Sequence, residues 1–374
     1  MKKITVMALH LGYGGIEKAI SDLCNSLSDK YNIEIVSTYK LFDEPINHLN
    51  DSINVKYLIP NLKPNKQRII ECIKKVKLIS LFKEGFKAIK ILYLRKRKMI
   101  NYIKNCNSDI IISTRIFHNN ILSKYASNTC TRIAWEHNYH NNNKTYIKKL
   151  ISSVKKLDYF VVVSKTLYND YENLLAESNC KCVFIPNMIN KNTQELSKVD
   201  NYNLVSVSRL SSEKGLYDLI DVVGLVKDSI KQVKLNIIGD GVLFKDLDCY
   251  IKNKNLSQNI KLLGYKKTDD VYKYLSKSSL YVMTSFTESF GIVILESFSC
   301  GVPVIAFDSA IGACELINEN NGYLISNRNK EKMAETIVNY FNDDKLRVKL
   351  SKGTQKELNY YLSHNVCKLW EKIL

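Results

Sequence analysis

Two carboxylates and a glycine stand close together in the segment ESFGIVILE, which we expect to pass from a loop into a helix. Glu288 lies in the loop and Glu296 near the second helical turn, and carboxylates accept hydrogen bonds from sugar or ribose hydroxyl groups. The first amides of a helix opened by Gly291 lack intrahelical partners, so with the backbone of Phe290 and Ile292 they can bind an anion. The spacing predicts a site for a ligand such as a sugar nucleotide, which has hydroxyl groups at both ends and a diphosphate between them.

Two cations five residues apart follow an expected strand in the segment SVSRLSSEKG. Parallel sheets with crossover helices bind ligands at the carboxyl ends of their strands, and this segment stands at such an end. The guanidinium of Arg209 can donate two parallel hydrogen bonds to a diphosphate, and Lys214 adds a compact positive charge. We expect both side chains to neutralise the diphosphate of the same ligand.

A glycine turn, GYGGIEK, follows the first expected strand and leads into an amphipathic helix. Gly14 and Gly15 allow a ligand to approach the backbone closely, and the helix N-terminus favours negative charge. The turn departs from the G-x-G-x-x-G spacing of a dinucleotide site, because Glu17 occupies the place of the last glycine. This departure weakens the case for a nicotinamide cofactor.

These three segments resemble the motifs of the retaining family 4 glycosyltransferases, which have the two-domain GT-B fold. ESFGIVILE resembles the E-x7-E motif, RLSSEKG the R-x4-K-G motif and GGIE the G-G-x-E motif. The resemblance implies that Glu288 holds the transferred sugar and Glu296 the ribose. It implies that Arg209 and Lys214 stabilise the departing nucleoside diphosphate, and that the turn at Gly15 faces the donor phosphate and the acceptor. It covers most of the second half of the chain and only patches of the first.

Supporting resemblances add four further residues to the expected site. His137 ends a strand and resembles the family histidine that contacts the transferred sugar. Gly239 resembles a glycine turn after a strand, and Gly264 with Tyr265 resembles the segment that borders the nucleotide base through its backbone. Met188 replaces the glycine of the family's P-N-G hinge, a departure that concerns loop geometry more than chemistry.

The resemblance implies retention at the anomeric carbon, with the leaving phosphate helping to deprotonate the acceptor on the same face. Nothing in the sequence singles out a carboxylate nucleophile of the kind that retaining glycosidases use, so no catalytic base is assigned. Asp246 and Asp248 have the D-x-D spacing of metal-dependent transferases, but their segment has a helical pattern and is expected to be a helix surface. Because Arg209, Lys214 and helix amides can neutralise the diphosphate, we expect no cofactor and no metal.

Short apolar strands alternate with helical patterns along almost the whole chain, which favours parallel sheets with crossover helices. The alternation predicts two doubly wound, Rossmann-like α/β domains, and the resemblance implies that they face across a cleft, as in the GT-B fold. The predicted divisions are an acceptor-binding domain 1–186, a linker 187–203, a nucleotide-sugar-binding domain 204–356, and a C-terminal helix 357–374 that crosses back to the first domain.

Thirteen strands are expected, seven in the first half and six in the second. The first seven are at 4–8, 33–37, 55–59, 109–113, 131–135, 159–163 and 182–185. The other six are at 204–207, 234–238, 259–263, 280–283, 302–306 and 323–325.

The net charge of +18 is unevenly placed, because the segment 63–104 holds fourteen Lys or Arg against two Glu, a net +12. Its apolar residues recur at helical spacing, which predicts a basic amphipathic segment. Such a segment either lies on an anionic membrane surface or is an ordinary solvated helix face. Nucleic-acid binding is not expected, because no recognition motif accompanies the charge. No apolar run reaches the roughly 18 residues of a membrane span.

These observations predict a hexosyltransferase-type enzyme that moves a hexosyl or N-acetylhexosaminyl unit from a nucleotide sugar to a hydroxyl group of a glycan. UDP is the nucleotide we expect, although no side chain identifies the base. The basic segment and the Lys-, Ile- and Asn-rich composition indicate a bacterial enzyme that extends a lipid-linked surface glycan, in capsular polysaccharide or lipopolysaccharide biosynthesis. The expected location is the cytoplasm, peripherally associated with the inner face of the plasma membrane.

Two alternatives remain open at this point. A sugar-nucleotide epimerase of the same fold would convert a donor without any acceptor. An inactive, membrane-associated binding subunit of a polysaccharide assembly complex would bind lipid without catalysis, although the complete set of Arg209, Lys214, Glu288 and Glu296 argues against it.

Overall fold

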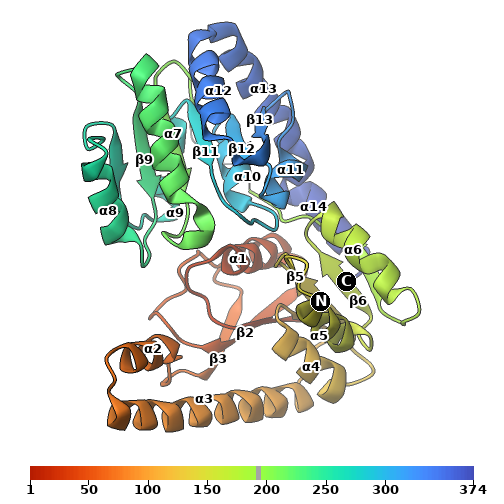
Figure 1. Cartoon of the computed structure of the whole chain (residues 1–374). Coiled ribbons are helices and arrows are strands. Elements are labelled where there is room, and N and C mark those ends of the chain that lie inside the picture. The colour runs from red at the N-terminus through yellow and green to blue at the C-terminus, as the bar shows by residue number, and fades with distance from the viewer. Residues whose placement is uncertain (191–194) are drawn as a thin grey trace. The chain divides into compact units, whose positions relative to one another are not determined.

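The computed structural model describes residues 1–190 and 195–374 (Figure 1). Contacts within the chain divide it into two compact units. The N-terminal unit comprises Met1–Val163, Leu167–Ile185 and Cys367–Leu374, and the C-terminal unit comprises Ser164–Thr166 and Pro186–Val366.

The N-terminal unit is built on a parallel sheet with the strand order β3-β2-β1-β4-β5-β6-β7. Its strands are β1 (Lys3–Ala8), β2 (Asn32–Tyr39), β3 (Asn54–Ile59), β4 (Ile110–Ser113), β5 (Thr131–Glu136), β6 (Tyr159–Val162) and β7 (Lys181–Phe184). The central strands are rich in Ile and Val and are buried, as strands covered by helices on both faces must be. The order changes direction between β1 and β4, which is the switch point where doubly wound sheets bind ligands.

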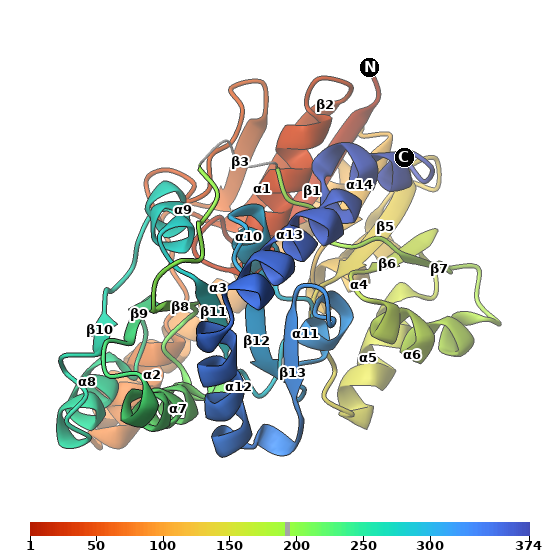
Figure 2. The ribbon, with the colours of Figure 1, turned by 90° about the horizontal axis from the view of Figure 1, so that it is seen from above.

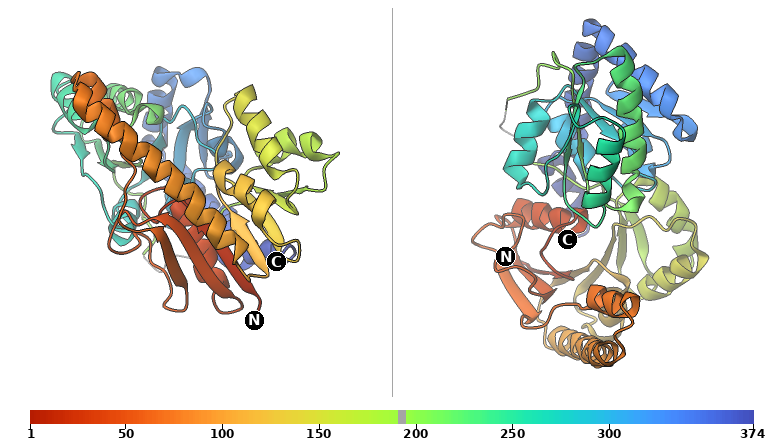
Figure 3. Two further views of the ribbon diagram at one scale, coloured as in Figure 1. Left: turned by 90° about the horizontal axis from the view of Figure 1, so that it is seen from below. Right: turned by 60° about the vertical axis from the view of Figure 1, so that its left-hand side comes forward.

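Helices cover both faces of this first sheet. They are α1 (Gly15–Leu27), α2 (Lys66–Lys74), α3 (Leu78–Lys104), α4 (Ile116–Tyr125), α5 (Lys144–Val154), α6 (Lys165–Leu175) and the end of α14 (Ser363–Trp370). Helices α1 and α14 lie on one face, and α3 and α4 lie on the other (Figures 2 and 3). Two contacts hold the C-terminal end against this unit. The ring of Trp370 lies 5.0 Å from that of Trp135 in an edge-on contact, and Lys2 Nζ donates to the Leu374 carbonyl at 2.7 Å.

The C-terminal unit repeats the plan with a parallel sheet in the order β10-β9-β8-β11-β12-β13. Its strands are β8 (Asn203–Val207), β9 (Lys234–Ile238), β10 (Ile260–Leu262), β11 (Leu280–Met283), β12 (Val304–Phe307) and β13 (Gly322–Ile325). Here β8 and β11 meet at the switch point, so the loops that follow them emerge side by side.

Two layers of helices sandwich the second sheet (Figure 2). They are α7 (Leu216–Ser229), α8 (Phe244–Asn253), α9 (Thr268–Ser276), α10 (Ile292–Ser299), α11 (Ile311–Leu316), α12 (Lys330–Asn342) and α13 (Asp344–Tyr361), with the short 3-10 turns η1 (Ser212–Lys214) and η2 (Ser326–Arg328). Apolar side chains of α7, α8 and α12 pack with the strands into one core that includes Val223, Leu247, Ile337 and Phe341. This rigid layer supports the loops at the carboxyl ends of the strands.

The predicted α/β class with two Rossmann-like domains is confirmed. All thirteen predicted strands are present, with ends shifted by two residues at most. A shift of two residues occurs at the end of β2 and at the start of β12, which begins at Val304 because Gly301 turns the chain at φ 71° and Pro303 follows.

The predicted linker 187–203 between the two sheets is not fully exposed in its described part. Residues 191–194 of the predicted linker lie outside the described residues. In the part that follows, Ser197 Oγ donates to the Ser278 carbonyl at 2.6 Å and Val199 is buried. Near the chain end, α13 continues to Tyr361 within the C-terminal unit, so the portion that joins the N-terminal unit is shorter than the helix 357–374 we expected.

None of the helices in the described ranges combines the length and the hydropathy that a bilayer-spanning segment requires.

Candidate functional site

The centre of the candidate site is formed by the loops that follow β8 and β11. Lys214 Nζ donates to Glu288 Oε2 at 2.5 Å, and both side chains are largely buried, with exposed fractions of 15% and 21%. The loops are also joined through their backbones, because the Phe286 N–H donates to the Glu213 carbonyl at 2.9 Å and Thr284 Oγ1 donates to the Lys214 carbonyl at 3.2 Å. Two segments that are distant in sequence therefore form one polar surface at the switch point of the sheet.

Gly215 makes the close approach of these loops possible. It follows η1 at φ 60°, a left-handed conformation that glycine adopts without strain. A Cβ atom there would lie 2.2 Å from the Thr284 carbonyl oxygen. Close packing therefore requires glycine at position 215, and Gly215 in turn sets the position of Lys214.

Arg209 lies in the same loop, but in the described part of the chain it pairs with Glu213 and not with Lys214 or Glu288. Its side chain is 71% exposed, and Nη2 donates to Glu213 Oε1 at 3.1 Å. Glu213 also accepts from Ser211 Oγ at 2.6 Å. An exposed ion pair of this kind contributes little to stability, so the guanidinium can exchange its partner for a ligand anion at small cost.

Helix α10 begins directly behind Glu288. Its N-cap is Gly291 at φ 86°, and no side-chain cap is formed there among the described residues, so the amides of its first turn can donate to a ligand. The preceding segment is fixed by the Gly312 N–H, which donates to the Glu288 carbonyl at 2.8 Å. Phe290 and Ile292 are buried, so these two residues can offer a ligand their backbone groups rather than their side chains.

Glu296 is buried in the second turn of α10, with an exposed fraction of 8%. It shares a neighbour with Glu288, because both carboxylates raise the pKa of the Tyr281 phenol, although burial is the larger cause. That phenol donates to the Val207 carbonyl at 3.0 Å and so connects β11 to the end of β8. The structure brings Lys214, Glu288 and Glu296 into one neighbourhood, with Arg209 in the same loop as Lys214.

The remaining predicted residues of this unit form turns beyond β9 and β10. The Gly239 N–H donates to the Gly264 carbonyl at 2.9 Å, and a Cβ atom at Gly239 would lie 1.8 Å from the Ser208 carbonyl oxygen. The turn after β9 is therefore packed against the Arg209 loop. At Gly264 the space is open, and the adjacent Tyr265 is 41% exposed.

In the N-terminal unit, the predicted glycines lie at the start of α1. Gly14 has φ 151°, and a Cβ atom there would lie 2.2 Å from Glu17 Oε2, so the carboxylate folds back over the turn. None of the described residues would lie within 4 Å of a Cβ atom at Gly15. Packing therefore explains glycine at position 14 but not at position 15.

His137 follows β5 and is buried, and its Nε2 atom forms no hydrogen bond with residues 1–190 or 195–374. Burial, together with the positive charge of Arg115, lowers the pKa of His137 to about 3. The neighbouring Glu136 accepts hydrogen bonds from the Asn138 N–H at 2.7 Å and from Tyr146 at 3.1 Å, and burial raises its pKa. His137 is therefore a neutral imidazole at neutral pH.

Sequence spacing did not point to Arg115, which pairs with Glu17 at 3.4 Å. Glu17 also lies 3.5 Å from His10, so one buried carboxylate joins the ends of β1 and β4. His140 Nε2 donates to Asp170 Oδ2 at 2.8 Å, since its Nδ1 accepts from the Asn142 N–H at 3.0 Å. No motif could have identified Arg115, because its partner Glu17 lies in α1, 98 positions earlier in the chain.

The prediction that Asp246 and Asp248 lie on a helix surface is confirmed. Both are in α8, where Asp248 pairs with Lys252 at 2.6 Å and Leu247 between them is buried. Within residues 1–190 and 195–374, no three His, Cys, Asp or Glu side chains are grouped in a way that could hold a metal ion.

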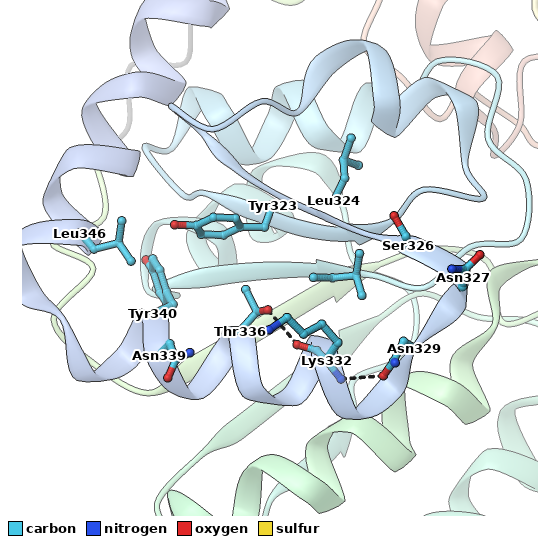
Figure 4. A pocket seen from close by; sticks show the side chains of 11 residues that line it. Tyr323, Leu324, Ser326, Asn327, Asn329, Lys332, Thr336, Asn339, Tyr340 and Leu346 are labelled. Carbon is cyan, nitrogen blue, oxygen red and sulfur yellow. Dashed lines mark hydrogen bonds between the residues drawn. The ribbon is translucent and has the colours of Figure 1, made fainter.

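A pocket of about 600 Å³ lies elsewhere in the C-terminal unit, between β13 and α12 (Figure 4). It contains none of the predicted site residues. Three of its polar side chains are engaged with the protein: Tyr340 donates to the Ser279 carbonyl at 2.6 Å, Thr336 donates to the Lys332 carbonyl at 2.7 Å, and Asn329 caps α12. The pocket is therefore not a candidate for the diphosphate.

Comparison with known proteins agrees with this fold. Residues 188–357 match the family model of the glycosyl transferases group 1. The chain is 28% identical over 360 residues to N-acetylgalactosamine-N,N'-diacetylbacillosaminyl-diphospho-undecaprenol 4-alpha-N-acetylgalactosaminyltransferase of Campylobacter jejuni, covering 93% of this chain and 92% of that one.

Two solved structures have the same fold over the whole chain. A TarM variant of S. aureus, crystallised with fondaparinux, alpha-GlcNAc-glycerol and UDP, has a TM-score of 0.79 at 17% identity and covers 100% of this chain and 99% of that one. HepE of Anabaena in complex with UDP has a TM-score of 0.75 at 17% identity, with the same coverage of both chains.

The fold and these matches together define a glycosyltransferase of the GT-B type. The match of residues 188–357 to the glycosyl transferases group 1 confirms the resemblance to GT-B glycosyltransferases that the motifs indicated.

Proposed function

We propose that the protein is a retaining, metal-independent glycosyltransferase that moves a hexosyl or N-acetylhexosaminyl unit from a UDP-linked sugar to a hydroxyl group of a lipid-linked glycan. The observation that carries the proposal is the contact of Lys214 with Glu288 in front of the N-terminus of α10. A cation, a carboxylate and helix amides at the switch point of a parallel sheet suit a ligand that combines a diphosphate with hydroxyl groups.

Each residue has a proposed role in the transfer. Negative charge grows on the leaving diphosphate as the bond to the sugar lengthens, and Lys214, Arg209 and the amides after Gly291 stabilise it. Glu288 holds the transferred sugar, and Glu296 accepts hydrogen bonds from the ribose. The leaving phosphate takes the acceptor proton, so the protein supplies no base.

The glycine turns and His137 complete the proposed site. Gly239, Gly264 and Tyr265 border the nucleotide, and the turn at Gly14 and Gly15 offers α1 amides to the donor phosphate and the acceptor. His137 is neutral because its pKa is about 3, so it would contact the transferred sugar as a hydrogen-bonding group and not as a cation.

Relatives support the nature of the donor and the acceptor. TarM and HepE were both crystallised with UDP, and this suggests a uridine nucleotide for the present chain. The Campylobacter jejuni relative, by its name, transfers N-acetylgalactosamine to a glycan on diphospho-undecaprenol. A lipid-linked acceptor in the synthesis of a bacterial surface polysaccharide fits both this relative and the basic surface described next.

Helices α2 and α3 carry the surface that we propose to lie on the inner face of the plasma membrane. The apolar side chains Ile79, Phe82, Phe86, Ile89 and Tyr93 recur every three or four residues, and each is more than 60% exposed. They therefore form one apolar stripe along α3, and we call it the α3 stripe. A continuous row of exposed large apolar side chains on a protein surface marks an interaction site.

The charge beside the α3 stripe favours an anionic membrane over a second copy of the chain. Lys83, Lys90 and the run 96–98 are exposed, and none of these side chains makes a salt bridge in the described part of the chain. Two copies facing each other would bring two segments of charge +12 together, which like-charge repulsion opposes. Anionic lipid attracts each exposed cation and receives the apolar side chains.

Donor binding followed by acceptor-dependent turnover tests the enzymatic proposal. A panel of nucleotide sugars should identify one that raises the unfolding temperature, because a ligand that binds only the folded state stabilises it. Release of UDP should then require a lipid-linked glycan acceptor. Conversion of the nucleotide sugar without any acceptor would show an epimerase instead, and lipid binding without donor binding or hydrolysis would show an inactive subunit.

A further inference from the structure

Arg328 has a backbone conformation that side chains with a Cβ atom rarely adopt. It ends η2, between β13 and α12, and φ is 56° at Asn327 and 50° at Arg328. Two consecutive non-glycine residues are thus left-handed, which crowds Cβ against the following carbonyl oxygen. Backbone strain of this kind persists only where many surrounding contacts hold the residue in place, and strained residues are concentrated at functional sites.

Four hydrogen bonds hold the guanidinium of Arg328. Nη1 donates to the Ser285 carbonyl at 3.1 Å and to Ser309 Oγ at 2.9 Å. Nη2 donates to the Thr284 carbonyl at 2.8 Å and to Asp218 Oδ2 at 2.5 Å. One side chain therefore fixes two successive carbonyl groups of the loop that leads from β11 to Glu288.

Two aromatic rings flank the same guanidinium. Its central carbon lies 3.7 Å from the ring centroid of Phe286 and 4.5 Å from that of Phe307. Phe307 is buried, whereas Phe286 is half exposed and covers the guanidinium from the solvent side. A planar guanidinium can stack on rings and donate in its plane at once, which a lysine ammonium cannot do.

The contacts of Arg328 extend to the loop that carries Lys214. A Cβ atom at Gly215 would lie 2.7 Å from Arg328 Nη2, so the guanidinium lies directly beside Gly215, the residue that follows Lys214. The Phe286 N–H donates to the Glu213 carbonyl, which joins the segment held by Arg328 to η1. The strain at Arg328 is thus coupled to the geometry of both loops that form the Lys214–Glu288 pair.

We infer that Arg328 is a positioning residue of the donor site, which holds the loop 284–286 against the Lys214 loop so that Lys214 and Glu288 bind the diphosphate and the sugar together. The inference rests on the proposed function and deepens it. Arg328 acts through these loops and does not touch the donor. A shift of about 1 Å in such loops is enough to reduce turnover about a hundredfold.

Arg328→Lys tests the inference, because it keeps the charge but loses the stacking and part of the hydrogen bonding. We expect the KM for the donor to rise about tenfold and kcat to fall about tenfold or more, while the KM for the acceptor stays near the wild-type value. Lys254→Ala is the matched control, because Lys254 pairs with Asp221 of α7 at 3.1 Å and, in the described ranges, forms no ion pair with Asp218 and no contact with the loop 284–286. Its donor kinetics should equal those of the wild type.

A double-variant cycle separates positioning from general loss of stability. If Arg328 acts through Lys214, the effects of Arg328→Lys and Lys214→Ala on kcat are less than multiplicative. Added guanidinium ion should also restore part of the turnover of Arg328→Ala, measured below its unfolding temperature. Wild-type donor kinetics in Arg328→Lys, or fully multiplicative effects without rescue, would overturn the inference. A wild-type chain that binds no nucleotide sugar would contradict the proposed function itself.

Discussion

Lys214 Nζ lies 2.5 Å from Glu288 Oε2 although 74 positions separate the two residues. They meet because β8 and β11 are neighbours at the switch point of the C-terminal sheet, so that the loops at their carboxyl ends emerge together. A lysine ammonium has three donors, and it can therefore keep Glu288 and still donate to a phosphate oxygen. The pair thus places a cation for the diphosphate beside a carboxylate for the sugar.

Removal of the Lys214 charge should reduce catalysis more than stability. We expect Lys214→Ala to lower kcat about 10²- to 10³-fold, because the leaving diphosphate loses a preorganised donor. Glu288→Gln should lower kcat with little change in the affinity for free UDP, because its carboxylate is assigned to the sugar. Steady-state kinetics and calorimetric titration with UDP measure both effects.

The ion pair of Lys252 with Asp248 on α8 supplies the control for these variants. It is exposed and lies on the helix surface that was distinguished from a metal site. Lys252→Ala should leave kcat and the affinity for UDP near the wild-type values. A Lys214→Ala variant with unchanged kcat would remove Lys214 from the site.

Gly15 and Gly239 should respond differently to alanine. At Gly15 a Cβ atom meets open space, so Gly15→Ala should leave stability unchanged or raise it by about 0.5 kcal/mol. If a ligand approaches this backbone, the same variant should still weaken turnover. At Gly239 the Cβ atom would lie 1.8 Å from the Ser208 carbonyl oxygen, so Gly239→Ala should lower the unfolding temperature strongly.

Thermal unfolding and kcat/KM distinguish the two glycines. Full activity in Gly15→Ala at unchanged stability would mean that no ligand approaches that turn. An unfolding temperature of Gly239→Ala equal to that of the wild type would contradict the close packing of the turns after β8 and β9.

The buried histidines should make the protein less stable in acid. Burial lowers the pKa of both His118 and His137 to about 3, with the charge of Arg115 as the second cause in each case. The unfolded chain therefore binds these protons from about pH 6.5 downward while the folded chain does not, and stability falls as the pH drops from 6.5 toward 3. The loss is roughly 3 kcal/mol for each histidine at pH 4.5.

Denaturant unfolding of the wild type and of His118→Gln at pH 7 and pH 4.5 measures this effect. The variant should lose less stability between the two pH values, because a glutamine binds no proton. Burial raises the pKa of Glu136, and its protonation changes the stability of both proteins equally. The effect of Glu136 therefore cancels when the two losses of stability are compared. Equal losses in the two proteins would mean that His118 is protonated in the folded state.

The α3 stripe should bind anionic vesicles. Phe82 and Phe86 are 70% and 73% exposed, so replacing both with Ser should weaken binding to vesicles that contain phosphatidylglycerol about tenfold or more. Tyr360→Ser is the control, because Tyr360 is a half-exposed aromatic residue on α13 in the other unit. Binding should weaken with added salt, since the exposed cations are screened.

Sedimentation with vesicles at two salt concentrations provides this measurement. Equal binding to neutral and anionic vesicles would contradict the electrostatic part of the proposal. Absence of binding to either kind, with a concentration-dependent dimer in solution, would show instead that the α3 stripe is covered by a second copy.

The alternation of apolar strands and helical patterns was enough to locate both sheets, because buried parallel strands must be apolar on both faces. The motif residues were also recognisable from the sequence, since a glycine that opens α10 and a carboxylate on each side of it have a local spacing. Local periodicity and local spacing need no knowledge of distant contacts. For that reason the fold class, the strand positions and the candidates Glu288, Glu296 and Lys214 followed from the sequence alone.

Only the tertiary structure decided which of these residues meet and what holds them. In the structure Lys214 pairs with Glu288, whereas Arg209 pairs with Glu213. Lys214 and Glu288 can meet because the order of strands in the sheet places their loops next to each other. The tertiary structure also revealed Arg328, whose partners come from α7, β12 and the loop after β11, at distances of up to 110 positions along the chain. Such contacts leave no periodic signal in the sequence, because they are set by the order of strands in the sheet.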